Sequence, residues 1–179
     1  MRVISGSARG KKLCTLEGMD IRPTLDRVKE SVFNMIAFDL PGASVLDLFC
    51  GSGALGIEAL SRGADHATFV DNNPKSLAVA QKNLTETHLA DRATSVLSDS
   101  LAFLKTTTKQ FDIIFIDPPY ESTLYQDVLA EITSRKLLKP DGQVVVELDK
   151  MTTPAFFVNG FSSQREKYYG RVKILIMKE

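Results

Sequence analysis

The stretch VLDLFCGSGALGIEAL, residues 45–60, decides the fold of this chain. An apolar run containing an acid leads into a glycine-rich turn and then into a segment with helical character. Gly51, Gly53 and Gly56 satisfy the pattern G-x-G-x-x-G, in which glycines let the backbone turn sharply and approach a ligand closely. Because the pattern stands between a predicted strand and a predicted helix, it indicates a ligand-binding loop rather than a tight turn alone.

Short apolar runs alternate with amphipathic stretches from residue 44 onward. The predicted strands are SVLDLF (44–49), HATFVD (66–71), ATSVLS (93–98), FDIIFID (111–117) and QVVVEL (143–148). Near-continuous apolar strands separated by helices indicate an α/β fold with a parallel sheet covered on both faces. Asn73 and Pro74 predict the start of a helix that runs to about Thr87. The last stretch predicts an antiparallel hairpin around Gly170, whose second strand has one apolar face.

Length and composition favour one ordinary globular domain. The chain has 179 residues, 44% of them hydrophobic and 25% charged, and we expect a single domain over residues 1–179. The N-terminus has no uninterrupted apolar core of a secretory signal, and no apolar run reaches the ~20 residues of a membrane span, so we expect a cytoplasmic protein. Its two cysteines and two histidines are isolated, so we expect neither a disulfide framework nor a metal.

The acid in front of the glycine loop points to a cationic ligand. Asp47 lies four residues before Gly51, and a carboxylate there suits an ammonium group and disfavours a phosphate. S-adenosylmethionine carries an ammonium, a sulfonium and a ribose, and no phosphate. Asp71, twenty residues beyond Gly51, can accept hydrogen bonds from the ribose. Asp99 can accept from the adenine amino group or cap a helix, and both roles can hold together.

The stretch FIDPPYES, residues 115–122, predicts an acceptor site. Ligands of open parallel sheets bind where the strands end, so Asp117 should join Asp47 and the other acids at that edge. Pro118 and Pro119 fix the backbone and offer no N–H, so the turn presents oxygens. The Asp117 carboxylate and the Pro118 carbonyl can accept both N–H groups of an exocyclic amine, while Tyr120 stacks on its planar ring. Because neither cysteine lies in this turn, methylation at nitrogen is favoured over the covalent route to carbon.

These motifs resemble a known family. DLFCGSGALGIEALSRGA (47–64) and DPPY look like the class I S-adenosylmethionine-dependent methyltransferases. Combined with RVISGSARGKKL (2–13) and IRPTLDRVKESVFNMI (21–36), they resemble the bacterial RsmD-type enzymes, which methylate a guanine N2 of 16S ribosomal RNA in the small subunit. The resemblance covers essentially the whole chain, although relatives commonly have Ala in place of Cys50 and often Phe in place of Tyr120.

The resemblance implies a Rossmann-like, seven-stranded, mostly parallel sheet of order 3-2-1-4-5-7-6 with the last strand antiparallel. It implies an amine clamp at residues 117–120 and an S-adenosylmethionine site at the positions that match the family motifs. With their neighbours, the candidate cofactor residues are Asp47, Phe49, Gly51, Ser52, Gly53, Asp71, Asn72, Asp99 and Ser100.

Both ends of the chain are basic although the net charge is zero. Residues 1–30 hold seven Lys or Arg and four Asp or Glu, while residues 31–160 hold ten and sixteen. Residues 1–22 are predicted to form a short hairpin extension whose charges bind rRNA phosphates, which position a substrate without reading its sequence. The candidate RNA-binding residues are Arg2, Arg9, Lys11, Lys12, Arg22 and Arg27. We expect a monomer whose partner is 16S rRNA in an assembled or assembling small subunit.

Three other interpretations remain open. An adenine-N6 methyltransferase acting on DNA or RNA would use the same clamp, although 179 residues leave little room for a target-reading region. A nicotinamide-dependent oxidoreductase would use the glycine pattern, but it leaves Asp47 and the Asp-Pro-Pro-Tyr turn unexplained. A catalytically silent RNA-binding module would tolerate Asp117→Ala.

Overall fold

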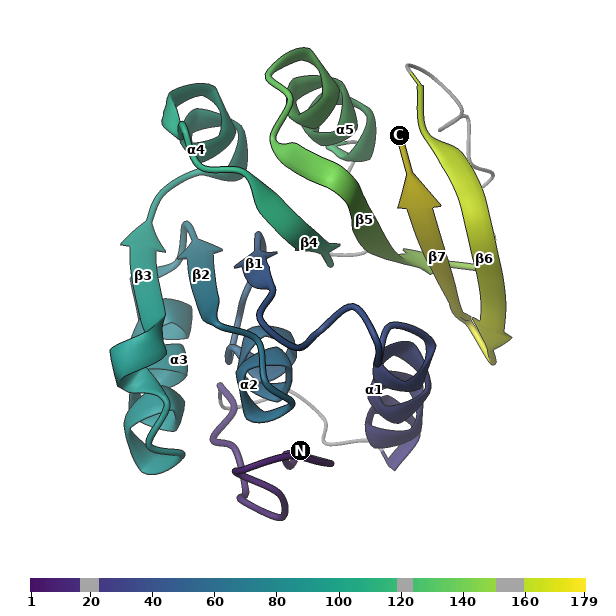
Figure 1. Cartoon of the computed structure of the whole chain (residues 1–179). Helices are drawn as coiled ribbons and strands as arrows, with labels where there is room; N and C mark the ends of the chain where they lie inside the picture. The colour runs from purple at the N-terminus through teal and green to yellow at the C-terminus, as the bar shows by residue number, and fades with distance from the viewer. Residues whose placement is uncertain (17–22, 119–123, 151–159) are drawn as a thin grey trace.

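One β-sheet with helices on both faces organises the chain (Figure 1). The computed structural model describes residues 1–16, 23–118, 124–150 and 160–179. Within these ranges seven strands stand in the order β3-β2-β1-β4-β5-β7-β6. The strands are β1 (Ser44–Asp47), β2 (His66–Asp71), β3 (Ala93–Leu97), β4 (Phe111–Ile116), β5 (Leu138–Asp149), β6 (Ser162–Tyr169) and β7 (Val172–Lys178).

The helices form two layers around this sheet. They are α1 (Pro23–Met35), α2 (Ala54–Ser61), α3 (Pro74–Glu86), α4 (Ser100–Thr106) and α5 (Tyr125–Ser134), with a short 3-10 helix η1 (Ala90–Arg92). Figure 1 shows α1, α2 and α3 on one side of the sheet and α4 and α5 on the other. A separate hydrophobic cluster fills each side, so the central strands are buried on both faces. No helix in the described part of the chain is both long enough and apolar enough to cross a membrane.

Strand directions confirm the predicted topology. Strands β1 to β5 pair in parallel, and β7 runs antiparallel to both of its neighbours, β5 and β6. The apolar face predicted for β7 is confirmed, and the other face of the strand, which was not predicted to be apolar, is buried as well. Ile174 and Ile176 join the cluster under α1, α2 and α3, while Leu175 and Met177 join the cluster under α4 and α5.

Local chemistry sets most element ends. The Asn73 side chain accepts a hydrogen bond from the Lys75 N–H at 2.9 Å, and Pro74 takes the first helical position, so the predicted start of α3 is confirmed. β5 begins at Leu138, five residues before the predicted run at Gln143. The residues between them form an irregularity in the pairing with β4, and Asp141 there has a φ of 65°.

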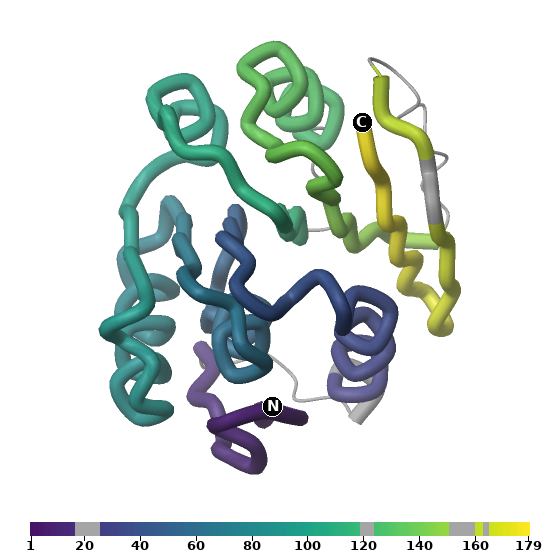
Figure 2. Tube along the Cα trace, viewed as in Figure 1, coloured from purple at the N-terminus to yellow at the C-terminus, as the bar shows by residue number. Residues whose placement is uncertain are grey.

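The N-terminal strap, residues 1–14, lies along the outer side of α2 (Figure 2). A single antiparallel bridge joins Arg2 to Lys12, and no extended strand is assigned within the described residues of this segment. The turn of the strap meets the end of α2, where the Ser7 N–H donates to the Ser61 carbonyl at 2.8 Å. Gly6 is required at this contact because it has a φ of 87° and an added Cβ would lie 1.8 Å from the Ser61 oxygen.

Candidate active site

The glycine loop connects β1 to α2 and is held at both flanking strands. The Leu48 N–H donates to the Phe115 carbonyl of β4 at 3.1 Å, and the Cys50 N–H donates to the Val70 carbonyl of β2 at 3.0 Å. Gly51 and Gly53 have φ values of 52° and 78°, a region that residues with a Cβ rarely enter. The loop is therefore fixed by its neighbours before any ligand arrives.

Gly56 has a different role from the two loop glycines. It lies on α2, and a Cβ added there would come within 2.3 Å of the Phe69 ring of β2. The absence of a side chain lets the helix pack directly on the sheet, which is the part that the third glycine plays in nucleotide-binding βαβ units. The predicted loop geometry is thus present in full.

Asp47 lies buried beneath the glycine loop. Its Oδ2 accepts a hydrogen bond from the Gly56 N–H at 2.9 Å, at the start of α2. Burial raises the pKa of its carboxyl to about 7; the hydrogen bond from Gly56 opposes this shift and the charge of Asp71 adds to it. A carboxylate in this position is stabilised by a cation, which fits the ammonium predicted from the sequence.

Asp71, at the end of β2, supports the glycine loop directly. Its Oδ2 accepts from the Gly51 N–H at 2.8 Å, and its Oδ1 accepts from the Asn73 N–H at 2.8 Å. Each carboxylate oxygen has a second lone pair for a ligand hydroxyl. The next residue, Asn72, is exposed. Asp71 therefore holds the loop in addition to being available to the predicted ribose.

Asp99 and Ser100 follow β3 at the same edge. The Asp99 carboxylate caps α4 by accepting from the Ala102 N–H at 3.0 Å, which confirms the capping role that the sequence left open. The Ser98 N–H donates to the Asp71 carbonyl at 3.0 Å, so these residues neighbour the predicted ribose site. Ser100 is buried, and its Oγ has no hydrogen-bond partner among the described residues. A buried hydroxyl of this kind fits a polar ligand atom.

Asp117 comes directly after β4, whose Phe115 is the register partner of Asp47. Its side chain is exposed to solvent, and Pro118 is buried. Desolvation raises the pKa of the Asp117 carboxyl, and the charges of Glu147 and Asp47 raise it further. Asp117 is therefore both accessible to water and closely surrounded by protein atoms, which explains why an exposed residue has a raised pKa. Pro119 and Tyr120 lie outside the described residues.

The cysteine in the glycine loop is not a nucleophile. Burial raises the pKa of the Cys50 thiol, and the charges of Asp47 and Asp71 raise it further, so the sulfur stays protonated. The acids near this cysteine do not form a metal site either. No cluster of three or more His, Cys, Asp or Glu within the described ranges could hold a metal ion.

Glu147 is a site residue that the sequence interpretation missed. It lies on β5, next to Val146, which is the register partner of Ile116. The sequence signal was an acid inside the apolar run QVVVEL, one strand away from Asp117. Five acids therefore gather where the parallel strands end, and they are Asp47, Asp71, Asp99, Asp117 and Glu147.

Asn83 was also missed, and it connects the glycine loop to the N-terminal strap. It is fully buried on α3, and its Nδ2 donates to the Ser52 carbonyl and the Cys14 carbonyl, both at 2.9 Å. Its Oδ1 accepts from the Cys14 N–H at 2.8 Å. One side chain therefore binds two segments that are far apart in sequence, so no local pattern could have revealed it.

Glu58 fixes the strap to α2 from beneath. Its carboxylate accepts from the Ile4 N–H at 2.8 Å and the Ser5 N–H at 3.0 Å. It also pairs with Lys29 at 3.1 Å and with Arg62 at 2.8 Å. The carboxylate is fully buried, and every partner named here is a donor.

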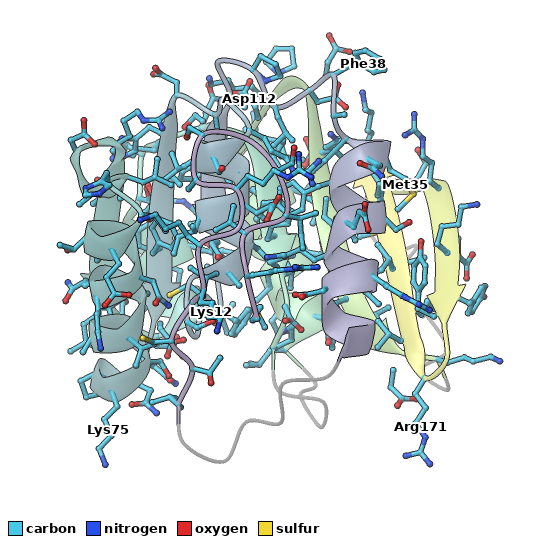
Figure 3. All side chains as sticks on the ribbon, turned by 90° about the horizontal axis from the view of Figure 1, so that it is seen from below. Lys12, Met35, Phe38, Lys75, Asp112 and Arg171 are labelled. Carbon is cyan, nitrogen blue, oxygen red and sulfur yellow. The ribbon has the colours of Figure 1, made fainter. Side chains whose placement is uncertain are left out.

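The basic candidates do not all lie at the edge where the five acids gather. Arg2, Lys11, Lys12 and Arg27 are exposed, whereas Arg22 lies outside the described residues. Arg9 is exposed on the turn that meets the end of α2, so the structure does not bring it to the edge where the five acids gather. Figure 3 shows Lys75 and Arg171 at one end of the view, Asp112 and Phe38 at the other, and Lys12 between the two ends.

Comparison with known proteins gives a consistent result. The family model described as "Conserved hypothetical protein 95" matches residues 1–178. The Bacillus subtilis protein named "Putative rRNA methyltransferase YlbH" is 40% identical over 182 residues, which cover 100% of this chain and 99% of that protein. "Ribosomal RNA small subunit methyltransferase D" of Haemophilus influenzae is 35% identical over 175 residues, 96% of this chain and 90% of that protein.

A solved structure agrees with these sequence matches. It is described as "Putative methyltransferase yhhF from Escherichia coli" and superposes with a TM-score of 0.85 at 35% identity, covering 99% of this chain and 96% of that one. The resemblance predicted from the motifs is confirmed. The chain belongs to the Conserved hypothetical protein 95 family, together with the ribosomal RNA small subunit methyltransferases D.

Proposed function

We propose that this protein transfers the methyl group of S-adenosylmethionine to the exocyclic N2 amine of a guanine in 16S rRNA of the small ribosomal subunit. The observation that carries the proposal is the placement of Asp117 and Pro118 directly after β4, beside Asp47 and the glycine loop. The names of the relatives support small-subunit rRNA as the substrate. The choice of guanine N2 rests on the resemblance of the sequence motifs.

The residues at the edge fit the cofactor. Asp47 is buried with a pKa raised to about 7, so it gains from a neighbouring ammonium group. Asp71 offers lone pairs to ribose hydroxyls, and Asp99 with Ser100 offers polar atoms to the adenine. Phe49, Ser52, Gly53 and Asn72 complete the proposed contacts. When bound, S-adenosylmethionine supplies an electrophilic methyl group on a sulfonium.

The acceptor amine is held by oxygens only. The Asp117 carboxylate accepts one N–H and the Pro118 carbonyl accepts the other, so the nitrogen lone pair is directed away from the turn. The nitrogen gains the methyl group as the carbon–sulfur bond breaks, and it then loses a proton to Asp117 or water. The raised pKa of Asp117 makes its carboxylate a better proton acceptor than an ordinary aspartate. Pro119 and Tyr120 are proposed to fix this turn and to stack on the base.

The strap and α1 are proposed to hold the RNA backbone. Exposed Arg2, Lys11, Lys12 and Arg27 would contact phosphates near the target base, and Arg22 is proposed with them. Arg9 lies farther along the strap, so its phosphate would be more distant from the target.

The primary test offers the protein three substrates in parallel. Labelled S-adenosylmethionine is incubated with unmethylated small subunits, free 16S rRNA or duplex DNA, and the labelled base is identified. We expect N2-methylguanine in the subunits or the rRNA. Label in N6-methyladenine would overturn the guanine assignment. Thermal stabilisation by NAD and not by S-adenosylhomocysteine would overturn the methyltransferase proposal as a whole.

A variant then tests the clamp. Asp117→Asn should lower kcat at least about 100-fold, because the amide has no negative charge and cannot take the proton of the amine, while S-adenosylhomocysteine still binds. The control is Asp65→Asn, an exposed acid on the turn before β2, which should behave as the wild type. If Asp117→Asn retained full transfer, the clamp would be wrong.

A further inference from the structure

The turn between β6 and β7 lies at the same edge of the sheet as Asp117. β7 is antiparallel to β5, so it begins where β5 ends, and Val172 is the register partner of Asp149. The Lys150 N–H donates to the Arg171 carbonyl at 2.7 Å, which joins the end of β5 to this turn. β7 stands two strands and β6 three strands from β4, so these strands lie about 10 Å and about 14 Å from β4 across the sheet.

An exposed aromatic ring lies beside this turn. Tyr168 on β6 is 53% exposed, unlike its neighbour Tyr169, whose hydroxyl meets the Ser31 hydroxyl of α1 and whose ring packs against the core. The two side chains point to opposite faces because they are consecutive in a strand. Tyr169 therefore accounts for the attachment of β6 to α1, and Tyr168 has no comparable packing role.

Two ammonium groups approach the Tyr168 ring. The Nζ atoms of Lys150 and Lys173 lie 6.0 Å and 5.5 Å from its centroid. Lys173 is buried, and its charge is matched by Glu166 at 2.8 Å, which also accepts from the Tyr168 hydroxyl. Lys150 and Arg171 are exposed. The nearby acid is thus neutralised locally, and two basic side chains are presented to solvent next to an aromatic ring.

Both lysines come from elements on the same side of β6 in the strand order. They belong to the end of β5 and to β7, and β6 is the last strand of the sheet, so no strand of the described chain covers the other side of Tyr168. Charged side chains near the edge of a sheet would by themselves be explained as protection against pairing with another sheet. That explanation does not account for an exposed aromatic ring beside two cations.

We propose that Tyr168, Lys150 and Arg171 form a stacking platform for a single-stranded nucleotide that flanks the target base in the rRNA. The ring stacks on the base, and the two basic side chains contact the adjacent phosphates. This inference rests on the proposed function, because it extends the RNA contacts from the strap to the turn between β6 and β7. It gives the enzyme a way to hold the substrate on both sides of the flipped or looped-out guanine.

A fluorescent variant tests the contact without any catalysis. The chain contains no tryptophan, so Tyr168→Trp introduces a single indole whose emission is quenched when a base stacks on it. The control is Phe38→Trp, at the opposite end in Figure 3, where the side chain is 99% exposed. With unmethylated 16S rRNA we expect quenching in the Tyr168→Trp variant and no change in the Phe38→Trp variant. Unchanged emission of Tyr168→Trp at RNA concentrations that saturate binding would overturn the platform.

Kinetics provide the second readout. Tyr168→Ala should raise the KM for rRNA on the order of tenfold with a much smaller effect on kcat, and Tyr168→Phe, which keeps the ring, should restore most of the affinity. Removing Lys150 and Arg171 should each lower the salt dependence of binding by about one unit. A lower melting temperature for Tyr168→Ala with an unchanged KM would show a structural role and overturn the proposal.

The two proposals fail in distinguishable ways. If the wild-type protein methylates rRNA while the indole of Tyr168→Trp does not respond and Tyr168→Ala keeps its KM, the platform alone is wrong. If the wild-type protein transfers no methyl group to rRNA or subunits, the proposed function is wrong.

Discussion

Two buried carboxylates next to α2 differ in how many hydrogen-bond donors and cations surround them. Glu58, beneath the strap, receives two backbone N–H groups and the cations of Lys29 and Arg62. Asp47, beneath the glycine loop, receives one N–H, and the neighbouring charge of Asp71 adds to the burial that raises its pKa. A buried carboxylate whose hydrogen bonds and ion pairs are all made within the protein stabilises the fold. A buried carboxylate without a neighbouring cation can instead bind a cationic ligand.

The largest effect should come from breaking the satisfied carboxylate. Glu58→Ala leaves the buried Lys29 ammonium and two strap N–H groups without their acceptor, so the free energy of unfolding should fall by about 3–5 kcal/mol. Urea denaturation measures this change. The control is Glu86→Ala, which removes an exposed pair with Lys82 and should change stability by no more than about 0.5 kcal/mol. Equal losses in the two variants would contradict the comparison.

Asn83 should be the next most sensitive position. Asn83→Ala removes the partners of the Cys14 backbone and of the Ser52 carbonyl, and we expect a loss of about 2–3 kcal/mol in unfolding free energy. The affinity for S-adenosylhomocysteine should fall too, because Ser52 belongs to the glycine loop. Denaturation and calorimetry measure the two effects. The control is Asn34→Ala at an exposed position on α1, which should change neither stability nor ligand affinity. If Asn83→Ala kept its ligand affinity, the proposed coupling of the strap to the glycine loop would be wrong.

Asp47→Asn should weaken ligand binding without loss of stability, whereas Glu58→Ala should lower the stability of the fold. The affinity for S-adenosylhomocysteine should fall about tenfold, or about 1.4 kcal/mol, because the ligand ammonium loses its carboxylate. Stability at about pH 8 should not fall, since the amide avoids burying a charge. Calorimetry and denaturation on one preparation give both values. A large loss of stability in Asp47→Asn would show that Asp47 stabilises the fold as Glu58 does, and would contradict the comparison.

The raised pKa of Asp47 predicts two pH dependences of opposite direction. In the free protein the folded-state pKa of about 7 exceeds the ordinary value of 3.8, so this group stabilises the fold below that ordinary pKa, and the contribution is lost as the pH rises towards 7. Ligand affinity should run the other way and weaken as the pH falls below about 7, by at most about tenfold per unit. Titration calorimetry from about pH 5.5 to about pH 8.5 tests this, and Asp47→Asn should lack both trends.

The smallest effect on stability should come from the strap surface. Exposed Arg2 pairs with half-buried Asp26 at a long 3.6 Å, so Arg2→Ala should change the unfolding free energy by less than about 1 kcal/mol. Its effect should appear in RNA binding instead, as a salt dependence reduced by about one unit. A filter-binding series over salt concentration measures this slope. An unchanged slope would remove Arg2 from the proposed RNA contacts.

The sequence predicted the parts of the site that depend on local order. The strand, glycine loop and helix of residues 44–61 follow from neighbouring residues, and Asp47, Asp71, Asp99 and Asp117 come to one edge because parallel strands end there. The strand order came from the family resemblance and is confirmed.

What the sequence did not reveal depends on distant partners. Glu58 meets Ile4 across 54 positions and Asn83 meets Cys14 across 69, and no local pattern encodes such pairs. The burial of the second face of β7 was not predicted, because Lys173 buries its stem and places its ammonium against Glu166. A sequence pattern predicts that a lysine is at the surface, whereas in the fold its long aliphatic stem can be buried.

The strap also sets an order for the making of the protein. Its first 14 residues leave the ribosome before any of their docking partners exist, since Glu58, Ser61 and Asn83 are all synthesised later. At roughly 5–20 residues per second, translation of the intervening stretch takes about 3–14 s. Throughout that interval the basic segment lacks at least one of these docking partners. The strap, although it comes early in the chain, can therefore dock completely only after α3 has been made.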